Sequence, residues 1–397
     1  MRCLLGCFQD PAASHSRPKR RFLFVSSPRL CPSAFATPAM GGLCSRVVAP
    51  APPGKTPQWS KESLAGALDH IPKAQEHAAN GLLDDAKSFP KSLANESMFE
   101  WSFDIFAVQY SDLPGLAYAA LRSHPELSAP ASNIDQDKLW RYVCELSARY
   151  HPRPFHSFRH AVDVLLATSS LMRMVLRDKA DAFRDPIVVG ALLIAALMHD
   201  VEHPGCMNSL LVATSHPLAA ESATSVLERH HAAVGLALLE RPQLDFLCNL
   251  PAAERTRFVE LVRDAVLATD VTSTVPLSKD FRTLLEAGGT PTSAQVMTMV
   301  IKAADISNPT RSLAVYQQWI EGVMDEFFVQ GDLERDKGLP LSMNCDRESV
   351  VVAKAQVGFI SFLVAPLFGA LATYAPALQP LVDALERNKG HFASLAA

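Results

Sequence analysis

His199 and Asp200 stand side by side at the end of the apolar run 187–198, and His203 follows three residues later. An apolar run of this length predicts a buried helix. Polar side chains at its end would be costly to bury unless something pairs with them. A divalent cation can bind imidazole nitrogen and carboxylate oxygen together, and zinc, manganese and iron suit such ligands. A capped helix end that carries polar surface residues is the alternative.

Two other segments carry candidate ligands. His156 and His160 are four residues apart at a predicted helix start, so they share one face of the helix. Thirteen histidines make one such pair a weak signal by itself. Asp305 lies in the otherwise apolar helical run 300–306, where a lone buried carboxylate is expensive. A helix N-cap or a salt bridge would also explain Asp305, and Asp270 is a similar but weaker case.

The three segments follow one another in the order His, His-Asp and Asp, each on its own predicted helix. This order resembles the signature of HD-type phosphohydrolases, and the set is far more specific than any of its parts. The sequence therefore predicts a metal-dependent phosphohydrolase whose metal is bound by His160, His199, Asp200 and Asp305.

The elements that position these residues are predicted to be helices. Apolar residues recur at spacings of three and four in the stretches 139–150, 161–176, 223–239 and 313–328. No alternating strand pattern of useful length occurs. We therefore expect an all-α, compact multi-helix catalytic domain, with 331–347 as a long loop.

Three regions are expected along the chain: an N-terminal tail at 1–60, a helical lead-in at 61–94 and the catalytic domain at 95–390. Up to Lys61 a single acid, Asp10, stands against nine basic residues. This composition favours a disordered or targeting segment, and it is also typical of transit peptides.

One pattern in the tail predicts lipid attachment. Met40, Gly41 and Ser45 fit the myristoylation motif, and Cys44 beside them could be palmitoylated. The motif works only if translation starts at Met40, and a chance match is the alternative. Two acyl chains would anchor the protein to a membrane stably.

The stretch 355–382 carries no charge and is long enough to cross a bilayer. Pro366, Pro376 and Pro380 interrupt it, so a core helix followed by a proline-broken segment is the favoured interpretation.

Composition limits the remaining classes. The chain is 48% hydrophobic with a net charge of -4, which favours a large core and argues against a nucleic-acid partner. Eight cysteines without a C-x-x-C pair argue against a zinc ribbon or a disulfide framework, and favour a reducing compartment. A cytoplasmic location, possible membrane association through the tail and organelle targeting all stay open.

Six motifs in order narrow the interpretation. They span 155–164, 199–208, 225–231, 268–270, 304–310 and 355–359. Together they resemble the catalytic domain of class I 3′,5′-cyclic nucleotide phosphodiesterases, and 101–106 is similar to that domain's opening segment. The likeness runs from about residue 95 to 370.

The resemblance implies hydrolysis of cAMP or cGMP to the 5′-monophosphate by two metals and a bridging hydroxide. The tight metal, usually zinc, would bind His160, His199, Asp200 and Asp305, and the second, usually magnesium or manganese, would share Asp200. Residues implied around the second metal are His203, Asn208, Glu228 and Asp270. The implied general acid is His156, and the implied purine-binding residues are Gln356, Phe359 and Asn308. Without the resemblance, Gln356 would be an interhelical hydrogen-bonding residue and Phe359 a core residue.

The chain departs from the family at two positions. Phe155 and Ser157 stand where the family usually has Tyr and Asn. Losing the tyrosine hydroxyl removes a polar contact near the phosphate, although serine can still cap the following helix. We expect activity, because the ligands and the acid are all present. An HD hydrolase of another phosphate ester and a nucleotide-binding pseudoenzyme are the alternatives. The choice between cAMP and cGMP, the oligomeric state, regulation and the start codon stay open.

Overall fold

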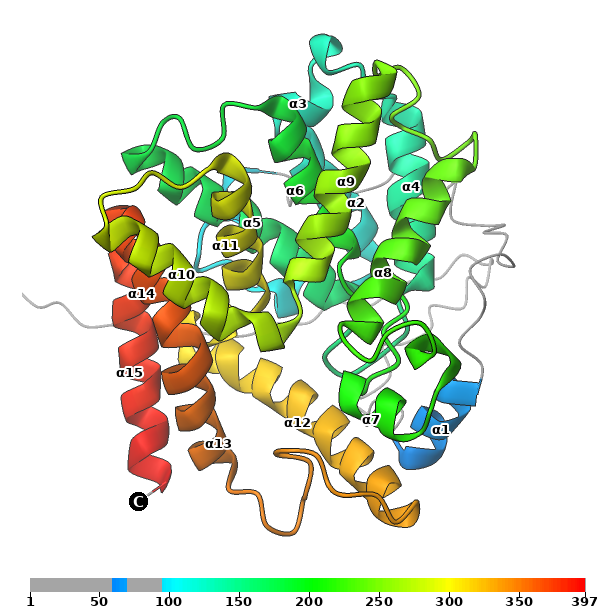
Figure 1. The fold of residues 1–397 in the computed structure, drawn as a ribbon, viewed down its shortest axis with the longest axis vertical. Coiled ribbons are helices and arrows are strands. Elements are labelled where there is room, and N and C mark those ends of the chain that lie inside the picture. The colour runs from blue at the N-terminus through cyan, green and yellow to red at the C-terminus, as the bar shows by residue number, and fades with distance from the viewer. Residues whose placement is uncertain (1–58, 70–94, 397) are drawn as a thin grey trace, which may run out of the picture. The chain divides into compact units, whose positions relative to one another are not determined.

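The computed structural model describes residues 59–69 and 95–396, and these residues fall in one compact unit. They contain helices and loops and no β-strand, which confirms the all-α prediction. The predicted tail and its acylation motif lie outside the described residues, apart from Trp59 and Ser60. The α-helices, labelled in Figure 1, are α1 (Lys61–Asp69), α2 (Leu113–Arg122), α3 (Pro125–Ser128), α4 (Gln136–Arg149), α5 (Phe158–Asp178), α6 (Pro186–Met198), α7 (Asn208–Ala213), α8 (Val226–Ala237), α9 (Ala252–Ala268), α10 (Thr274–Glu286), α11 (Ser293–Asp305), α12 (Leu313–Asp336), α13 (Val352–Phe359), α14 (Ala365–Tyr374) and α15 (Gln379–Ala396).

Helix α6 lies at the centre of the core. Its sequence has no charged side chain, and from Val188 to Met198 every residue is buried. A helix that is apolar all round must be covered on all sides. Helices α5, α9 and α11 pack against it (Figure 1). The C-terminal end of α6 therefore lies in the protein interior, where side chains of α5 and α11 can approach it.

The long helix α12 continues past the predicted loop start. Gly331 lies inside the helix, and the loop begins only after Asp336. The prediction of a loop at 331–347 was thus wrong at its N-terminal end. Gly331 is required by close packing rather than by a turn, because a Cβ there would collide with the backbone carbonyl of Cys345.

The apolar stretch near the C-terminus folds as two helices joined by a π-helix at Ile360–Val364. Val352–Tyr374 is long and apolar enough to cross a bilayer, a test that the core helix of a soluble protein also passes. Leu367 and Phe368 are fully buried in the protein core. Pro366, which has no N–H to donate, stands two residues after the π-helix, where the regular α-helical hydrogen-bond pattern is interrupted.

Candidate metal centre and active site

The four predicted ligands converge on one point. His160 comes from the first turn of α5, His199 and Asp200 follow the end of α6, and Asp305 is the last residue of α11. His160 Nε2 lies 3.1 Å from Asp305 Oδ1 and 3.6 Å from Asp200 Oδ2. His199 Nε2 lies 3.1 Å from Asp200 Oδ2 and 3.3 Å from Asp305 Oδ1. The four ligand atoms, one from each residue, all lie within 4.8 Å of one another.

These separations suit a single divalent cation. Two ligands held about 2.1 Å from a zinc ion, at 90–110° to each other, lie about 3.0–3.4 Å apart. His199 Nδ1 donates to the carbonyl of Ala196 at 2.9 Å, so its Nε2 carries a free lone pair directed at the cluster. That buried Nε2 has no hydrogen-bond partner among the described residues. The donor set and the unpartnered nitrogen both fit a bound metal.

The two carboxylates are held in the charged form that a metal needs. Burial favours the neutral acid of Asp200, but positive charge on the nearby histidines, His199 first, outweighs it and holds the pKa of the carboxyl well below its usual range. A cation bound by the neutral Nε2 of His199 would supply this positive charge in place of the imidazole proton. The same balance of burial and His199 lowers the pKa of Asp305.

His156 is fixed by a residue that the sequence did not single out. Glu326, buried on α12, accepts hydrogen bonds from the backbone N–H of Phe155 at 2.7 Å and of His156 at 2.9 Å. Its other oxygen lies 2.5 Å from His156 Nδ1. The His156 ring stacks on His203 with 3.8 Å between ring centroids. Burial lowers the pKa of His156, but Glu326 outweighs it and raises that pKa to about 9. The side chain therefore carries a proton at neutral pH.

Phe155 and Ser157, the two departures from the family pattern, adopt clear environments. The Phe155 ring packs 4.6 Å from the His160 ring and 5.3 Å from that of Trp319, so the aromatic packing is in place without a hydroxyl. Ser157 occupies the N-cap position of α5, but its side chain makes no capping hydrogen bond. The expectation that this serine caps the helix is therefore wrong.

His231, on α8, is a second residue that the sequence analysis passed over. Its Nδ1 donates to the carbonyl of Val201 at 2.6 Å, so Nε2 carries a lone pair. That atom is buried, has no hydrogen-bond partner within 59–69 and 95–396, and lies 3.8 Å from Asp200 Oδ1. Asp200, His203 and His231 form a second group that could hold a metal. The motif at 225–231 was the available signal, but it pointed only to Glu228.

The residues expected around the second metal fall into separate pairs. Asn208 donates to Glu228 Oε2 at 3.0 Å and accepts the N–H of Leu227 at 2.8 Å. Burial raises the pKa of Glu228 to about 7. Asp270 accepts the hydroxyl of Ser225 at 2.6 Å. Asp270 therefore supports the start of α8 and makes no hydrogen bond to Asn208.

The predicted purine-binding residues lie on two elements. Gln356 is buried on α13, and Phe359 follows it by three residues on the same helix face. The hydroxyl of Tyr316 donates to Gln356 Oε1 at 2.6 Å. Asn308 is buried after the end of α11, and its Nδ2 has no hydrogen-bond partner in the part of the chain that the structure describes. Tyr316, which the sequence analysis did not assign, contacts the glutamine amide through its hydroxyl.

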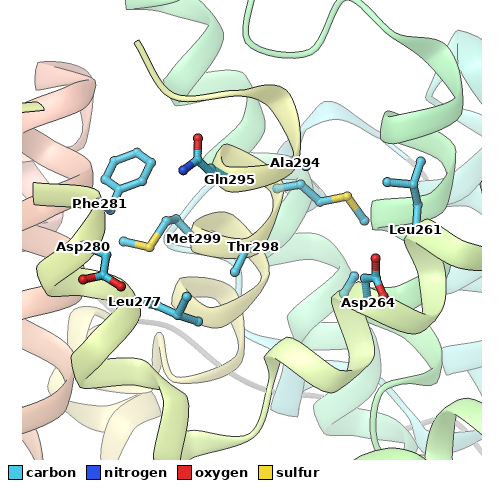
Figure 2. Close-up of a pocket in the computed structure, with 11 residues that line it drawn as sticks. Leu261, Asp264, Leu277, Asp280, Phe281, Ala294, Gln295, Thr298 and Met299 are labelled. Carbon is cyan, nitrogen blue, oxygen red and sulfur yellow. The ribbon is translucent and has the colours of Figure 1, made fainter. Parts of the chain in front are cut away.

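The cavity in Figure 2 lies elsewhere. It has a volume of about 230 Å³ and is lined by residues of α9, α10 and the first half of α11, including Asp264, Phe281 and Met299. None of the candidate site residues lines it. Met299 precedes Asp305 by six residues, which places it about 9 Å away along the helix. The cavity is therefore separate from the metal centre.

Comparisons with known proteins agree with the motifs. Residues 155–385 match the family model described as 3′5′-cyclic nucleotide phosphodiesterase. The chain is 34% identical to a Drosophila melanogaster 3′,5′-cyclic-AMP phosphodiesterase, isoform F, over 74% of this chain and 46% of that protein. It is 32% identical to the Rattus norvegicus 3′,5′-cyclic-AMP phosphodiesterase 4C, over 88% of this chain and 68% of that protein. The chain thus spans about half the length of the Drosophila protein.

Solved structures show the same fold. The phosphodiesterase domain of the RhoPDE fusion protein from the choanoflagellate Salpingoeca rosetta is 28% identical, with a TM-score of 0.70 over 77% of this chain and 98% of that one. The structure of LmjPDEB1 in complex with IBMX is 25% identical, with a TM-score of 0.73 over 81% of this chain and 99% of that one.

Proposed function

The chain belongs to the 3′,5′-cyclic nucleotide phosphodiesterase family, and we propose that it hydrolyses cAMP to 5′-AMP. The observation that carries this proposal is the convergence of His160, His199, Asp200 and Asp305 beside a protonated histidine, His156. A ligand set of this kind together with a proton donor can cleave a phosphate ester.

The metals and His156 would have different roles in the reaction. His160, His199, Asp200 and Asp305 would hold one divalent cation, zinc by the nature of the ligands, and Asp200 would be shared with a second, magnesium or manganese. Bound cations of this kind lower the pKa of a water and offset the negative charge of the phosphate. Glu326 keeps the Nδ1 side of His156 occupied, which leaves the Nε2 proton for the substrate.

Proton and bond changes then balance. A water loses one proton to solvent and its oxygen attacks phosphorus, the bond from phosphorus to the 3′ oxygen breaks, and that oxygen takes a proton from His156, which regains one from solvent. The products are the 5′-monophosphate and a free 3′ hydroxyl. A leaving alkoxide is poor without such a proton, so His156 lowers the barrier at the bond that breaks.

The base site supports cAMP as substrate. An unrestrained glutamine amide can present its donor and acceptor in either order. Here the hydroxyl of Tyr316 donates to Gln356 Oε1, and we propose that this contact favours one orientation of the amide. Adenine and guanine present opposite donor and acceptor patterns on the edge that a glutamine contacts, so a fixed amide favours one of them. Relatives in fly and rat are named cAMP phosphodiesterases, which supports adenine.

A direct assay tests the proposal. The purified chain is incubated with cAMP or cGMP in the presence of Mg²⁺ or Mn²⁺, with and without a chelator, and the 5′-monophosphate is measured. We expect chelator-sensitive turnover of cAMP that exceeds that of cGMP. Tight nucleotide binding without turnover under any metal condition would favour the pseudoenzyme and overturn the proposal.

A further inference from the structure

Glu202 adopts a backbone conformation that its side chain does not favour. Its φ is 61°, in the left-handed region, where a residue with a Cβ is strained. The other non-glycine residues with positive φ among those described are asparagines and serines. Asparagine tolerates this region because its short side chain can bond locally, whereas glutamate has no such advantage. Something outside the turn must hold Glu202 there.

Two buried side chains hold it, an arginine and a histidine. Glu202 Oε1 accepts a hydrogen bond from Arg149 Nη1 at 2.7 Å, and Oε2 lies 3.1 Å from His230 Nε2. The three side chains are between 2% and 8% exposed, so the contacts are dry. Arg149 comes from the end of α4 and His230 from α8. The carboxylate of Glu202 therefore joins two helices that approach the turn from different directions.

The turn that contains Glu202 also carries site residues. Asp200 precedes it by two positions and His203 follows it directly. The same two helices hold the neighbouring backbone, since Tyr150, which caps α4, contacts the N–H of Asp200 through its hydroxyl at 3.3 Å. On the other side, His231 of α8 donates to the carbonyl of Val201. The direction of the Asp200 carboxylate is thus set by bonds to α4 and α8.

We propose that Glu202 is a positioning residue for the metal centre. Its paired carboxylate holds the 199–205 turn in the strained conformation that directs Asp200 toward His160, His199 and Asp305. The affinity of the chain for a divalent cation then depends on the charge of Glu202, although Glu202 does not touch the cation. This inference rests on the proposed metal-dependent function.

A purely structural role is the competing explanation, in which Glu202 only neutralises the buried Arg149. Glu145 provides a matched control, because it belongs to the same charge network. Glu145 Oε1 lies 3.2 Å from Arg149 Nε and 3.1 Å from Arg241 Nη1, and its side chain is 6% exposed. It lies on α4, and its hydrogen bonds among the described residues go to Arg149 and Arg241 rather than to the 199–205 turn. Glu145→Gln and Glu202→Gln therefore remove the same charge from one network, but only the second touches the turn.

The test measures Mn²⁺ binding to the full chain by electron paramagnetic resonance of the free ion, without nucleotide. Residues that orient metal ligands typically change affinity by about 10–100-fold. We expect Glu202→Gln to weaken Mn²⁺ binding by at least about tenfold on this scale. Glu145→Gln should stay within about threefold of the wild type, because the ligands keep their orientation. Turnover of cAMP should show a lower kcat with little change in KM.

A second variant covers the case in which Glu202→Gln folds poorly. Adding Arg149→Met removes the unpaired buried cation and should restore the melting temperature. If the double variant also regains full Mn²⁺ affinity, or if the two single variants lose affinity equally, the role is structural and the inference is wrong. If the variants differ in Mn²⁺ affinity as expected but the wild type turns over no cyclic nucleotide, the positioning role stays intact and the proposed function alone is overturned. A wild-type chain that binds no Mn²⁺ would overturn both.

Discussion

Replacing Gly322 by alanine tests how the general acid is held. Gly322 lies on α12 one turn before Glu326, and it allows the backbone at Pro154 to approach the helix closely. A Cβ at position 322 would lie 2.6 Å from the carbonyl oxygen of Pro154. Because the obstacle is backbone rather than the end of a side chain, the 154–156 segment has to move as a unit.

The size of the effect follows from these distances. Relieving the contact to about 3.4 Å needs a shift of about 0.8 Å, from 2.6 Å to normal van der Waals separation. The same shift would stretch the Glu326 bonds of 2.7 and 2.9 Å to about 3.5 and 3.7 Å, beyond hydrogen-bonding range. Overpacking of this kind costs about 1–3 kcal/mol, more than the ~0.5–1 kcal/mol that alanine gains over glycine in a helix. Misplacing His156 by this amount should lower kcat by about 10–100-fold.

Gly369→Ala is the matched control. Gly369 also lies in a helix, α14, and a Cβ there would meet nothing within 4 Å. Urea unfolding should show Gly369→Ala stabilised by up to about 1 kcal/mol and Gly322→Ala destabilised. Kinetics with cAMP should show a normal kcat only for the control. If Gly322→Ala is as stable and as active as Gly369→Ala, the close backbone approach does not matter and the account of Glu326 is wrong.

Four further predictions concern single side chains. His156→Ala should retain metals and bind cAMP but lose at least about 10²-fold in kcat, and unchanged turnover would remove His156 from the acid role. Asp305→Ala should lose metal by elemental analysis and melt at a lower temperature, whereas full zinc content would contradict its assignment as a ligand. Tyr316→Phe frees the amide of Gln356, so the ratio of kcat/KM for cAMP over cGMP should move toward one, and an unchanged ratio would show that the hydroxyl does not set selectivity. Burial lowers the pKa of His124 to about 4 from 6.5, so between these pH values the unfolded chain binds the proton more readily, and the free energy of unfolding falls as pH drops from about 6.5 to 4. His124→Gln should flatten this decline in unfolding experiments. An unaltered pH profile would show that the imidazole is not buried.

The residues of the proposed metal centre could be predicted because burial itself was the signal. His199, Asp200 and Asp305 each stand at the end of an apolar run, where a charged group needs a partner, and the structure places their ligand atoms together. Periodicity likewise predicted α5 to within three residues at each end, whereas α11 begins seven residues before the apolar run 300–306 that pointed to it. The fold class followed from the same periodicity, because no segment alternated in the manner of a strand.

The partners of those residues could not be predicted, because they depend on how distant segments approach. Glu326 lies 170 positions from His156. It is one of several acids on a helix of mixed polarity, so in the sequence it looks like a surface residue, and only the structure shows the 154–156 backbone packed against it. Tyr316 is 40 positions from Gln356, and an aromatic residue on a core helix gives no sign that its hydroxyl is used. The sequence predicted a loop at Gly331, because the reason for glycine there cannot be seen locally. A Cβ at this position would collide with the backbone of Cys345, which lies on another segment.

One stripe of α12 shows how these contacts combine. Gly322, Glu326, Gln330 and Glu334 recur every four residues, so they lie along one side of the helix. A core helix would normally present apolar side chains there, but each of these residues instead meets the backbone of a loop. Gly322 admits Pro154, Glu326 accepts from Phe155 and His156, Gln330 accepts the N–H of Met207 at 2.7 Å, and Glu334 accepts that of Ser342 at 2.7 Å. Because backbone donors are held independently of the side chains they carry, this stripe can fix three loops along α12 while the loops themselves vary in sequence. The replacement of Tyr and Asn by Phe155 and Ser157 is a change of that kind, since Glu326 bonds to the backbone of Phe155 and would do so with either residue.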